Sequence, residues 1–397
     1  MRPLAITGVG LVSPLGVGYG ALCQAIADHG RIGSSAFRSR CTVFDPEKIE
    51  APLAAEAWDF DATEYLGKKG LRNFDRLTRF LLVSAKHALE HAGLKLDGEH
   101  RVYGGERVGV CSATAYGSLD SITELVEVAE LEDPRFLNPN RFPNTVINTA
   151  AGYVSIREDL RAPNVTVVDG NCGALDAVLN AETHLHNDRA DAFLVGGGEV
   201  LSDPLYLAFR KLGALAEEPE RYAPGSAEGY GMRLGEGAAY LCVEHDGRAT
   251  ERGARVLGRV VGYGNAFEPP QSEAALVHAS PLALERAIAM ALDDAGLGPD
   301  DLDLVCASMN GLGPFDRAEL EALDRSVGPE LPVVLPKALI GETFGAGGAL
   351  GAMWALAAFE GLPVGPLLRG TIAGRPERAL VVAVGFYGNA SALVLSR

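Results

Sequence analysis

The sequence predicts an α/β protein made of two related halves. Strand-like and helix-like runs alternate along the chain, and the alternation begins again after the Asp246-Gly247-Arg248 turn. No low-complexity segment or flexible linker separates the two parts. We place the boundary near 246–255, which gives halves of residues 1–250 and 251–397, and we expect the halves to pack as one body.

The first half alternates short apolar, β-branched runs with runs at helical spacing. The predicted strands are Leu4–Gly8, Arg107–Ser112, Val165–Val168, Ala192–Val195 and Ala239–Glu244, and the predicted helices are Gly20–Asp28, Arg76–Ala92, Leu175–His186 and Pro204–Leu212. A large insertion is expected around 115–163. Within it, Leu119–Leu131 has helical spacing, Asn138–Asn148 is loop-like with two prolines, and a helix follows up to about Arg157.

The second half repeats the same kind of alternation. Its predicted strands are Val256–Tyr263, Leu302–Ala307, Val333–Leu335 and Leu380–Val384, and its predicted helices are Leu282–Ala295, Asp316–Ser326 and Ala346–Phe359. These elements follow one another in the order expected for a second βα unit.

Composition excludes several classes of function. The 397 residues carry a net charge of −17, which argues against nucleic-acid binding, and no apolar run is long enough to cross a membrane. The early Arg2 and the apolar run after it lack a convincing cleavage site, so we expect a first strand and a cytoplasmic protein. The six cysteines are scattered without metal-binding spacing. We expect neither a metal nor a cofactor.

The turn Asn171-Cys172-Gly173 is the strongest candidate for chemistry. It follows the strand-like run Val165–Val168 and leads into a helical pattern. A thiol at such a turn would lie near the positive end of the helix dipole, which lowers a thiol pKa.

A series of motifs carries a resemblance to one family. In order along the chain they are Ile6–Gly16, Pro143–Gly152, Val195–Glu199, Leu234–Ala238, Pro336-Lys337, Phe344–Gly348 and Gly385–Asn389. This ordered series resembles the β-ketoacyl synthases. The resemblance implies the thiolase fold, with two βαβαβαββ halves in five layers, α-β-α-β-α, usually as a dimer. It also implies a cysteine that takes the acyl chain and two histidines that stabilise an enolate oxyanion by donating hydrogen bonds.

The chain departs from the family at each of these three positions. Counting back from the Gly196–Glu199 motif puts Asn171 at the cysteine position and Cys172 one residue late. Ser308 stands where His-Gly-Thr-x-Thr-x-x-x-Asp has its histidine, and Glu342 stands where Lys-x-x-x-Gly-His has its own. Lys337 is retained, and we expect it to form a buried ion pair with Glu342.

Further residues are assigned on the same resemblance. Phe386 matches a phenylalanine that gates the family's pocket, and we place Phe209 and Asn389 at the pocket with it. Asp316 and Glu319 are expected to hold loops by hydrogen bonds.

The segment Gly170–Asp176 also resembles the Glu-Gln-Ala-Gly-Gly-Leu-Asp of chain length factors, the silent partners of type II polyketide ketosynthases. This implies a non-condensing subunit that pairs with a ketosynthase having an intact Cys-His-His triad and helps shape the tunnel for a polyketide, polyene or fatty-acid-like chain. The expected interface comprises the 138–148 loop, the segment near Leu119–Leu131, and Asp176, which alternatively serves at the helix start. Acyl carrier protein, an acidic partner, would need a local basic patch, to which Arg72, Arg76 and Arg79 could contribute; an ordinary solvated helix face is the alternative.

Two other functions stay open at this point. Cys172 could act as the nucleophile of an active 3-oxoacyl-(acyl carrier protein) synthase-like acyltransferase with atypical partners. Alternatively, the chain could be a homodimeric acyl-binding or scaffold protein. Decarboxylation of a malonyl group is disfavoured, because Glu342 would place a second anion beside the malonyl carboxylate.

Overall fold

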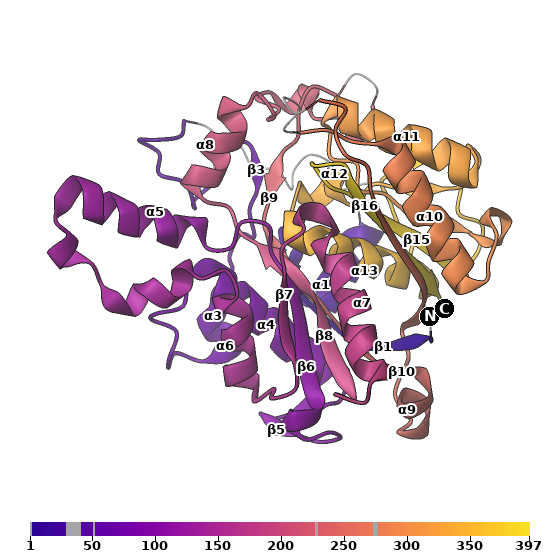
Figure 1. The fold of residues 1–397 in the computed structure, drawn as a ribbon, viewed down its shortest axis with the longest axis horizontal. Helices are drawn as coiled ribbons and strands as arrows, with labels where there is room; N and C mark the ends of the chain where they lie inside the picture. The colour runs from indigo at the N-terminus through magenta and orange to yellow at the C-terminus, as the bar shows by residue number, and fades with distance from the viewer. Residues whose placement is uncertain (1, 29–40, 51, 227–228, 273–276) are drawn as a thin grey trace.

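A continuous path of paired strands runs through the centre of the protein in the computed structural model (Figure 1). The structure describes residues 2–28, 41–50, 52–226, 229–272 and 277–397. The strand order is β14-β13-β12-β15-β16-β11-β1-β10-β8-β6-β7, with β2 paired to β1.

The path consists of two sets of five strands with the same topology. The first set is β1 (Leu4–Ser13), β6 (Val108–Ala113), β7 (Asn164–Val167), β8 (Ala192–Glu199) and β10 (Gly237–His245); the second is β11 (Gly258–Phe267), β12 (Leu304–Cys306), β13 (Val333–Val334), β15 (Arg378–Val384) and β16 (Asn389–Ser396). Numbered along the chain, the strands of each set lie in the order 3-2-4-5-1. The sets meet where β1 pairs antiparallel with β11, Leu4 opposite Val260. The remaining strands are short: β2 (Gly16–Val17), β3 (Ala54–Ala55), β4 (Lys95–Leu96), β5 (Glu99–His100), β9 (Leu234–Gly235) and β14 (Leu367–Arg369).

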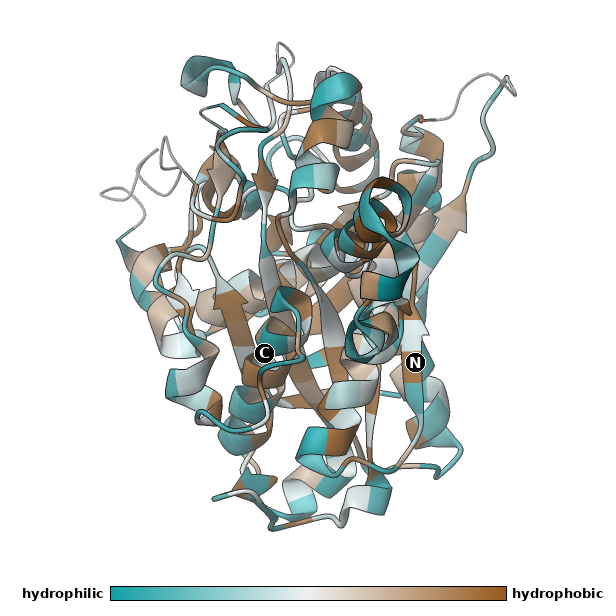
Figure 2. Ribbon diagram, turned by 90° about the vertical axis from the view of Figure 1, so that its left-hand side faces the viewer, coloured by the Kyte–Doolittle hydropathy of each residue, from teal (hydrophilic) through white to brown (hydrophobic). Residues whose placement is uncertain are grey.

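Helices cover both faces of each set and give a five-layered, thiolase-like architecture. The outer helices of the first set are α4 (Arg76–His91) and α6 (Thr149–Glu158), and those of the second are α10 (Pro281–Ala295) and α11 (Gly313–Val327). Helices α7 (Gly173–His186) and α13 (Gly347–Phe359) contact each other between the two sets. Residues Gly348–Phe359 are all buried, as expected for a helix that is apolar on every side. In Figure 2 the central strands are mostly brown, the colour of hydrophobic residues.

The remaining helical elements are short. They are α1 (Tyr19–Ala27), α3 (Ala62–Leu66), α5 (Leu119–Glu127), α8 (Asp203–Lys211), α9 (Asp246–Glu251) and α12 (Lys337–Ile340), together with the turns η2 (Gly105–Arg107), η3 (Val128–Glu132), η4 (Pro134–Phe136), η5 (Pro139–Thr145), η6 (Gly170–Cys172), η7 (Pro219–Arg221), η8 (Pro299–Asp301) and η9 (Phe344–Ala346).

The predicted long elements are present, but some details of the prediction were wrong. Strand β16 was not predicted, because its interior residues are buried on both faces and include alanine and serine, so it shows no polar–apolar alternation. The predicted turn at Asp246-Gly247-Arg248 is the start of helix α9. Pro139–Thr145, predicted as loop, forms a 3₁₀ helix, because Asn138 caps it and Pro139 stands at its first position.

The connection between β6 and β7 contains α5, η3, η4, η5 and α6, whereas the equivalent connection between β12 and β13 contains α11 alone. Figure 1 shows α5 and the turns after it projecting from the body. We call residues 119–147 the arm. Large apolar side chains of the arm and of neighbouring elements are exposed: Ile122, Val126, Leu131, Phe136, Phe142, Val146, Ile147, Ile156, Val168 and Leu179.

Candidate functional site

The turn η6 lies between the end of β7 and the start of α7, as the sequence predicted. Gly170 adopts φ 53, a left-handed conformation that favours glycine. Gly173 lies so close to β6 that an added Cβ atom would come within 2.9 Å of the Ala113 Cβ. The turn is therefore pressed against the sheet, and the direction of its side chains is fixed.

Asn171 and Cys172 point to different surroundings. The Asn171 Nδ2 donates to the Val384 carbonyl oxygen at 3.1 Å and to Glu342 Oε2 at 3.3 Å. The Cys172 side chain is fully buried among core residues, with its Sγ 3.6 Å from the carbonyl oxygen of Ala383. Burial raises the pKa of the Cys172 thiol well above its ordinary value, and the nearby Asp176 carboxylate raises it further. The thiol is thus neutral and enclosed.

Glu342 is the centre of a buried polar cluster. Its Oε2 accepts hydrogen bonds from Lys337 Nζ at 2.8 Å and from Asn310 Nδ2 at 2.7 Å, and its Oε1 accepts from the Phe344 backbone N–H at 2.9 Å. Lys337, Glu342 and Asn310 are 3%, 0% and 3% exposed. The expected ion pair between Lys337 and Glu342 is present. The Glu342 carboxylate thus has an oppositely charged partner and several hydrogen-bond donors, which are the conditions under which a charged group can be buried.

Ser308 lies on the other side of Lys337. Its Oγ accepts from Lys337 Nζ at 3.0 Å and from the Val384 backbone N–H at 3.4 Å. Glu319 accepts from the Ser308 backbone N–H at 2.7 Å, and burial raises the pKa of the Glu319 carboxyl to about 8. Serine therefore occupies the position beside the lysine, and the buried carboxyl of Glu319 supports the loop behind it.

Asp316 holds the same loop, as predicted. Its two carboxylate oxygens accept from the backbone N–H groups of Asn310, Gly311 and Gly225 at 2.7 to 3.0 Å. Burial raises the pKa of Asp316. These bonds fix the backbone that carries Asn310 towards Glu342.

Aromatic rings pack beside the polar cluster. Phe209 and Phe386, which the sequence placed at a pocket, lie together with ring centroids 6.2 Å apart, and Phe344 lies 5.4 Å from Phe209. Phe315 and Tyr116 complete this group, at 5.1 Å from Phe386 and 5.2 Å from Phe344. All four phenylalanines are buried. Phe344 has φ 40, a conformation that a bulky residue adopts only under constraint.

Asn389 joins a different group of residues. Its Nδ2 donates to Asp169 Oδ1 at 2.8 Å. Asp176 accepts from the hydroxyl groups of Tyr263 and Ser391, both at 2.6 Å, and burial raises the pKa of Asp176 to about 7. Asp176 is thus in the first turn of α7, as proposed for a helix-start residue, and its carboxyl ties α7 to β11 and β16.

The predicted arginine face has a different structure. Helix α4 begins at Arg76, so Arg72 lies outside it. Arg76 is neither part of a free basic patch nor on an ordinary solvated face, because its Nη2 lies 2.5 Å from the fully buried carboxylate of Glu236. Arg79 donates to the Leu71 carbonyl oxygen. The expected face of three arginines was therefore wrong, because Arg72 precedes the helix and because the sequence could not show the buried Glu236, which lies between β9 and β10.

Sequence reasoning missed Asn310 and Phe344. Asn310 follows Ser308 by two residues in a loop that was noted for its lost histidine, so polarity near that position was the available signal. Phe344 was seen only as part of a glycine-rich motif, and the packing of its ring required the fold.

The described part of the chain shows no cluster of three or more His, Cys, Asp or Glu side chains that could hold a metal ion. Among the helices in these same ranges, none has the length and apolarity of a membrane span.

Known proteins are similar to this chain over its whole length. The model of the β-ketoacyl synthase N-terminal domain matches residues 1–249, and that of the C-terminal domain matches 257–368. A 3-oxoacyl-[acyl-carrier-protein] synthase 2 of Coxiella burnetii is 31% identical, over 88% of this chain and 84% of that protein. The tetracenomycin polyketide synthase ketoacyl synthase beta subunit of Streptomyces glaucescens is also 31% identical, over 100% of this chain and 98% of that protein.

A solved structure shows the same fold. The ishigamide ketosynthase/chain length factor superposes with a TM-score of 0.85 at 24% identity, over 100% of this chain and 99% of that one. Together with the two matching family models and the 3-2-4-5-1 strand order in each set, these likenesses show that the chain belongs to the β-ketoacyl synthase family.

Proposed function

We propose that this chain is a non-condensing ketosynthase-like subunit, which pairs with an intact ketosynthase and helps shape the tunnel in which a polyketide, polyene or fatty-acid-like chain grows. One observation carries the proposal. The side chain of η6 that points to the Lys337–Glu342 pair is the Asn171 amide, while the Cys172 thiol is enclosed in the core.

The chemistry of the cluster supports this reading. Condensation needs a thiolate and hydrogen-bond donors for a developing oxyanion. The amide of Asn171 is not a nucleophile, and the Glu342 carboxylate would repel an oxyanion formed beside it. Lys337 cannot offset this, because it already balances Glu342 at 2.8 Å.

The surface supports association with a partner. Strand β7 is at the end of the strand path, and no further strand pairs with it in the described ranges. The elements that contact β7 or follow it carry the exposed apolar side chains Ile156, Val168 and Leu179, and the projecting arm carries Leu131, Phe136 and Phe142 at 80%, 72% and 66% exposure. An unpaired edge strand beside an exposed apolar surface is typical of a subunit interface. Asp176 does not belong to this surface, because its carboxyl is bonded inside the chain.

Two of the similar proteins support a subunit role. The similar Streptomyces glaucescens protein is a beta subunit, and the similar solved structure is a ketosynthase/chain length factor. We propose by analogy that the partner here is a ketosynthase with an intact Cys-His-His triad, and that acyl carrier protein is recognised chiefly through that partner.

The test is reconstitution from purified components. This chain, a co-expressed ketosynthase and their complex are each incubated with acyl and malonyl carrier proteins, and the products are measured by mass spectrometry. We expect product from the complex and none from this chain alone. Condensation by the isolated chain would refute the proposal.

Association is measured on the same samples by native mass spectrometry. We expect a heterodimer of the two subunits. A homodimer that does not bind the ketosynthase would favour an acyl-binding or scaffold protein instead.

A further inference from the structure

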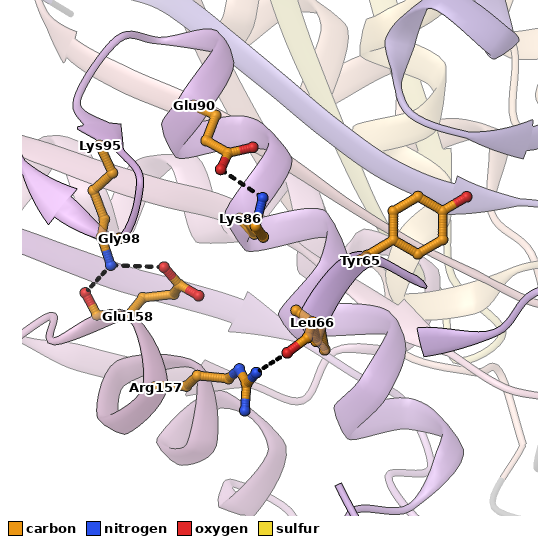
Figure 3. Close-up of a pocket in the computed structure, with 8 residues that line it drawn as sticks. All are labelled: Tyr65, Leu66, Lys86, Glu90, Lys95, Gly98, Arg157 and Glu158. Atoms are coloured by element: carbon orange, nitrogen blue, oxygen red, sulfur yellow. Dashed lines mark hydrogen bonds and ion pairs between the residues drawn. The ribbon is translucent and has the colours of Figure 1, made fainter. Parts of the chain in front are cut away.

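A half-open pocket on the outer side of the first strand set lies outside the site described above. It is about 260 Å³ in volume. Its walls come from the end of α3, the last turns of α4, the β4–β5 hairpin and the end of α6. Figure 3 shows the residues that line it: Tyr65, Leu66, Lys86, Glu90, Lys95, Gly98, Arg157 and Glu158.

The charges around this pocket do not balance. Lys95 pairs with Glu158 at 2.7 Å, both buried, and Lys86 pairs with Glu90 at 2.5 Å. Arg157 is the remaining cation, and no carboxylate of the described residues lies within ion-pair distance of it. Its Nη2 donates to the Leu66 carbonyl oxygen at 2.6 Å. The pocket therefore keeps one net positive charge in a chain whose net charge is −17.

The three cations also keep unused donors. An arginine has five N–H groups and a lysine ammonium has three. Arg157 uses one of its five in the bond to Leu66, and Lys95 uses two of its three, on the carbonyl and carboxylate oxygens of Glu158. Lys86 uses one on Glu90. In Figure 3 the three side chains come from different walls, whereas the Tyr65 hydroxyl points away from them.

We infer that this pocket binds a phosphate group through Arg157, Lys86 and Lys95. A tetrahedral oxyanion presents acceptors to several walls at once, and a guanidinium with free donors matches two of its oxygens. The size of the pocket suits an ion or a small monoester. The inference stands independently of the function proposed above, because none of these residues contacts the Glu342 cluster.

The neighbouring carboxylates give phosphate binding a second testable consequence. Glu90 competes with an anion for the ammonium of Lys86, and its charge repels the anion. Removal of the Glu90 charge should therefore strengthen binding, while removal of the Arg157 or Lys86 charge should weaken it. A merely structural role of Arg157, closing the end of α3, would predict no binding at all.

The experiment titrates the full chain with orthophosphate at constant ionic strength, by calorimetry and by phosphorus NMR. We expect saturable binding of one phosphate per chain, weakened about tenfold or more in Arg157→Gln and Lys86→Gln and tightened in Glu90→Gln. Arg161→Gln is the matched control, because Arg161 is 62% exposed and pairs with Glu106 outside the pocket. It loses the same charge and should bind as the parent does.

Two results would contradict phosphate binding at this pocket. Absence of saturable binding to the parent chain would overturn the inference, as would equal binding by the parent, Lys86→Gln and Glu90→Gln. The Lys86 and Glu90 variants decide the matter if Arg157→Gln does not fold, because their ion pair is about one-third exposed. Phosphoserine in a parallel titration distinguishes the source: tighter binding of the monoester points to a phosphorylated molecule, and tighter binding of orthophosphate points to the free ion.

Discussion

The Glu342 cluster and the arm differ in whether their side chains have suitable partners within the chain. In the cluster, the buried charges of Lys337 and Glu342 neutralise each other, and Asn171, Ser308 and Asn310 bond to them. In the arm, large apolar side chains remain in contact with solvent. The polar groups of the cluster find their partners within one chain, whereas the apolar side chains of the arm remain exposed. This difference fits the subunit role proposed above.

The largest expected effect is on stability, from breaking the ion pair. Glu342→Leu leaves the Lys337 ammonium buried without a counter-charge, and we expect the free energy of unfolding to fall by about 3–5 kcal/mol. The double variant Lys337→Met/Glu342→Leu should recover most of that loss, because two apolar groups replace the pair. Urea denaturation of the three proteins measures this. A double variant as unstable as the single one would show that the cluster depends on more than charge balance.

The next effect tests the arm. Val126→Asp places a charge on an exposed apolar position of α5, and we expect its affinity for the ketosynthase to fall roughly 10–100-fold, because a charge would be desolvated in the contact. Met290→Asp is the matched control on α10, since Met290 is 50% exposed and Val126 is 53% exposed. Surface plasmon resonance with the immobilised partner gives both affinities. Equal weakening by the two variants would remove the arm from the interface.

The two regions also differ in how far the sequence could predict them. The motif count placed Asn171, Ser308 and Glu342 at the family's three catalytic positions, and in the structure these residues meet around Lys337 and Glu342. It also foresaw the Lys337–Glu342 pair. It did not reveal Asn310 or the packing of Phe344, because these depend on a loop held by Asp316 and on a φ of 40 that no pattern of residue types encodes.

The exposed surface was harder to foresee than the site. Helical spacing in Leu119–Leu131 predicted a helix, but the exposure of Val126 and Leu131 follows from the projection of the arm away from the body. The prediction of an arginine face on α4 was wrong for a related reason, since the Glu236 partner of Arg76 comes from the segment just before β10. Local pattern shows which residues share a face, and the tertiary fold decides what that face meets.

A smaller expected effect is the pH dependence of the free energy of unfolding, which arises from buried carboxyl groups and not from the arm. Burial raises the pKa of Glu319 to about 8 from an ordinary 4.5, so the folded chain holds a proton that the unfolded chain has released between these values. The unfolded state binds fewer protons in this window, and the free energy of unfolding therefore falls as pH rises through it. Asp176 and Glu199, each with a pKa of about 7, act in the same direction.

Thermal unfolding between pH 5.5 and 8.5 measures this dependence. We expect Tm to fall as pH rises, and Glu319→Gln to flatten the profile because the amide does not titrate. Glu330→Gln is the control, since Glu330 is exposed and its loss changes only the overall charge. Identical slopes in both variants would assign the dependence to the net charge of the chain rather than to the buried carboxyls.

The smallest expected effect concerns the cysteine position itself. Asn171→Cys would place a thiol beside the Glu342 carboxylate, and a neighbouring negative charge raises a thiol pKa. The thiol should therefore stay protonated at neutral pH, react slowly with iodoacetamide and form no condensation product. Peptide mass spectrometry follows the labelling of position 171, with Cys172→Ala added so that the neighbouring thiol does not contribute to the same peptide. Rapid labelling together with acyl transfer by this variant would mean that only the nucleophile had been lost, and that Ser308, Lys337 and Glu342 still form working machinery.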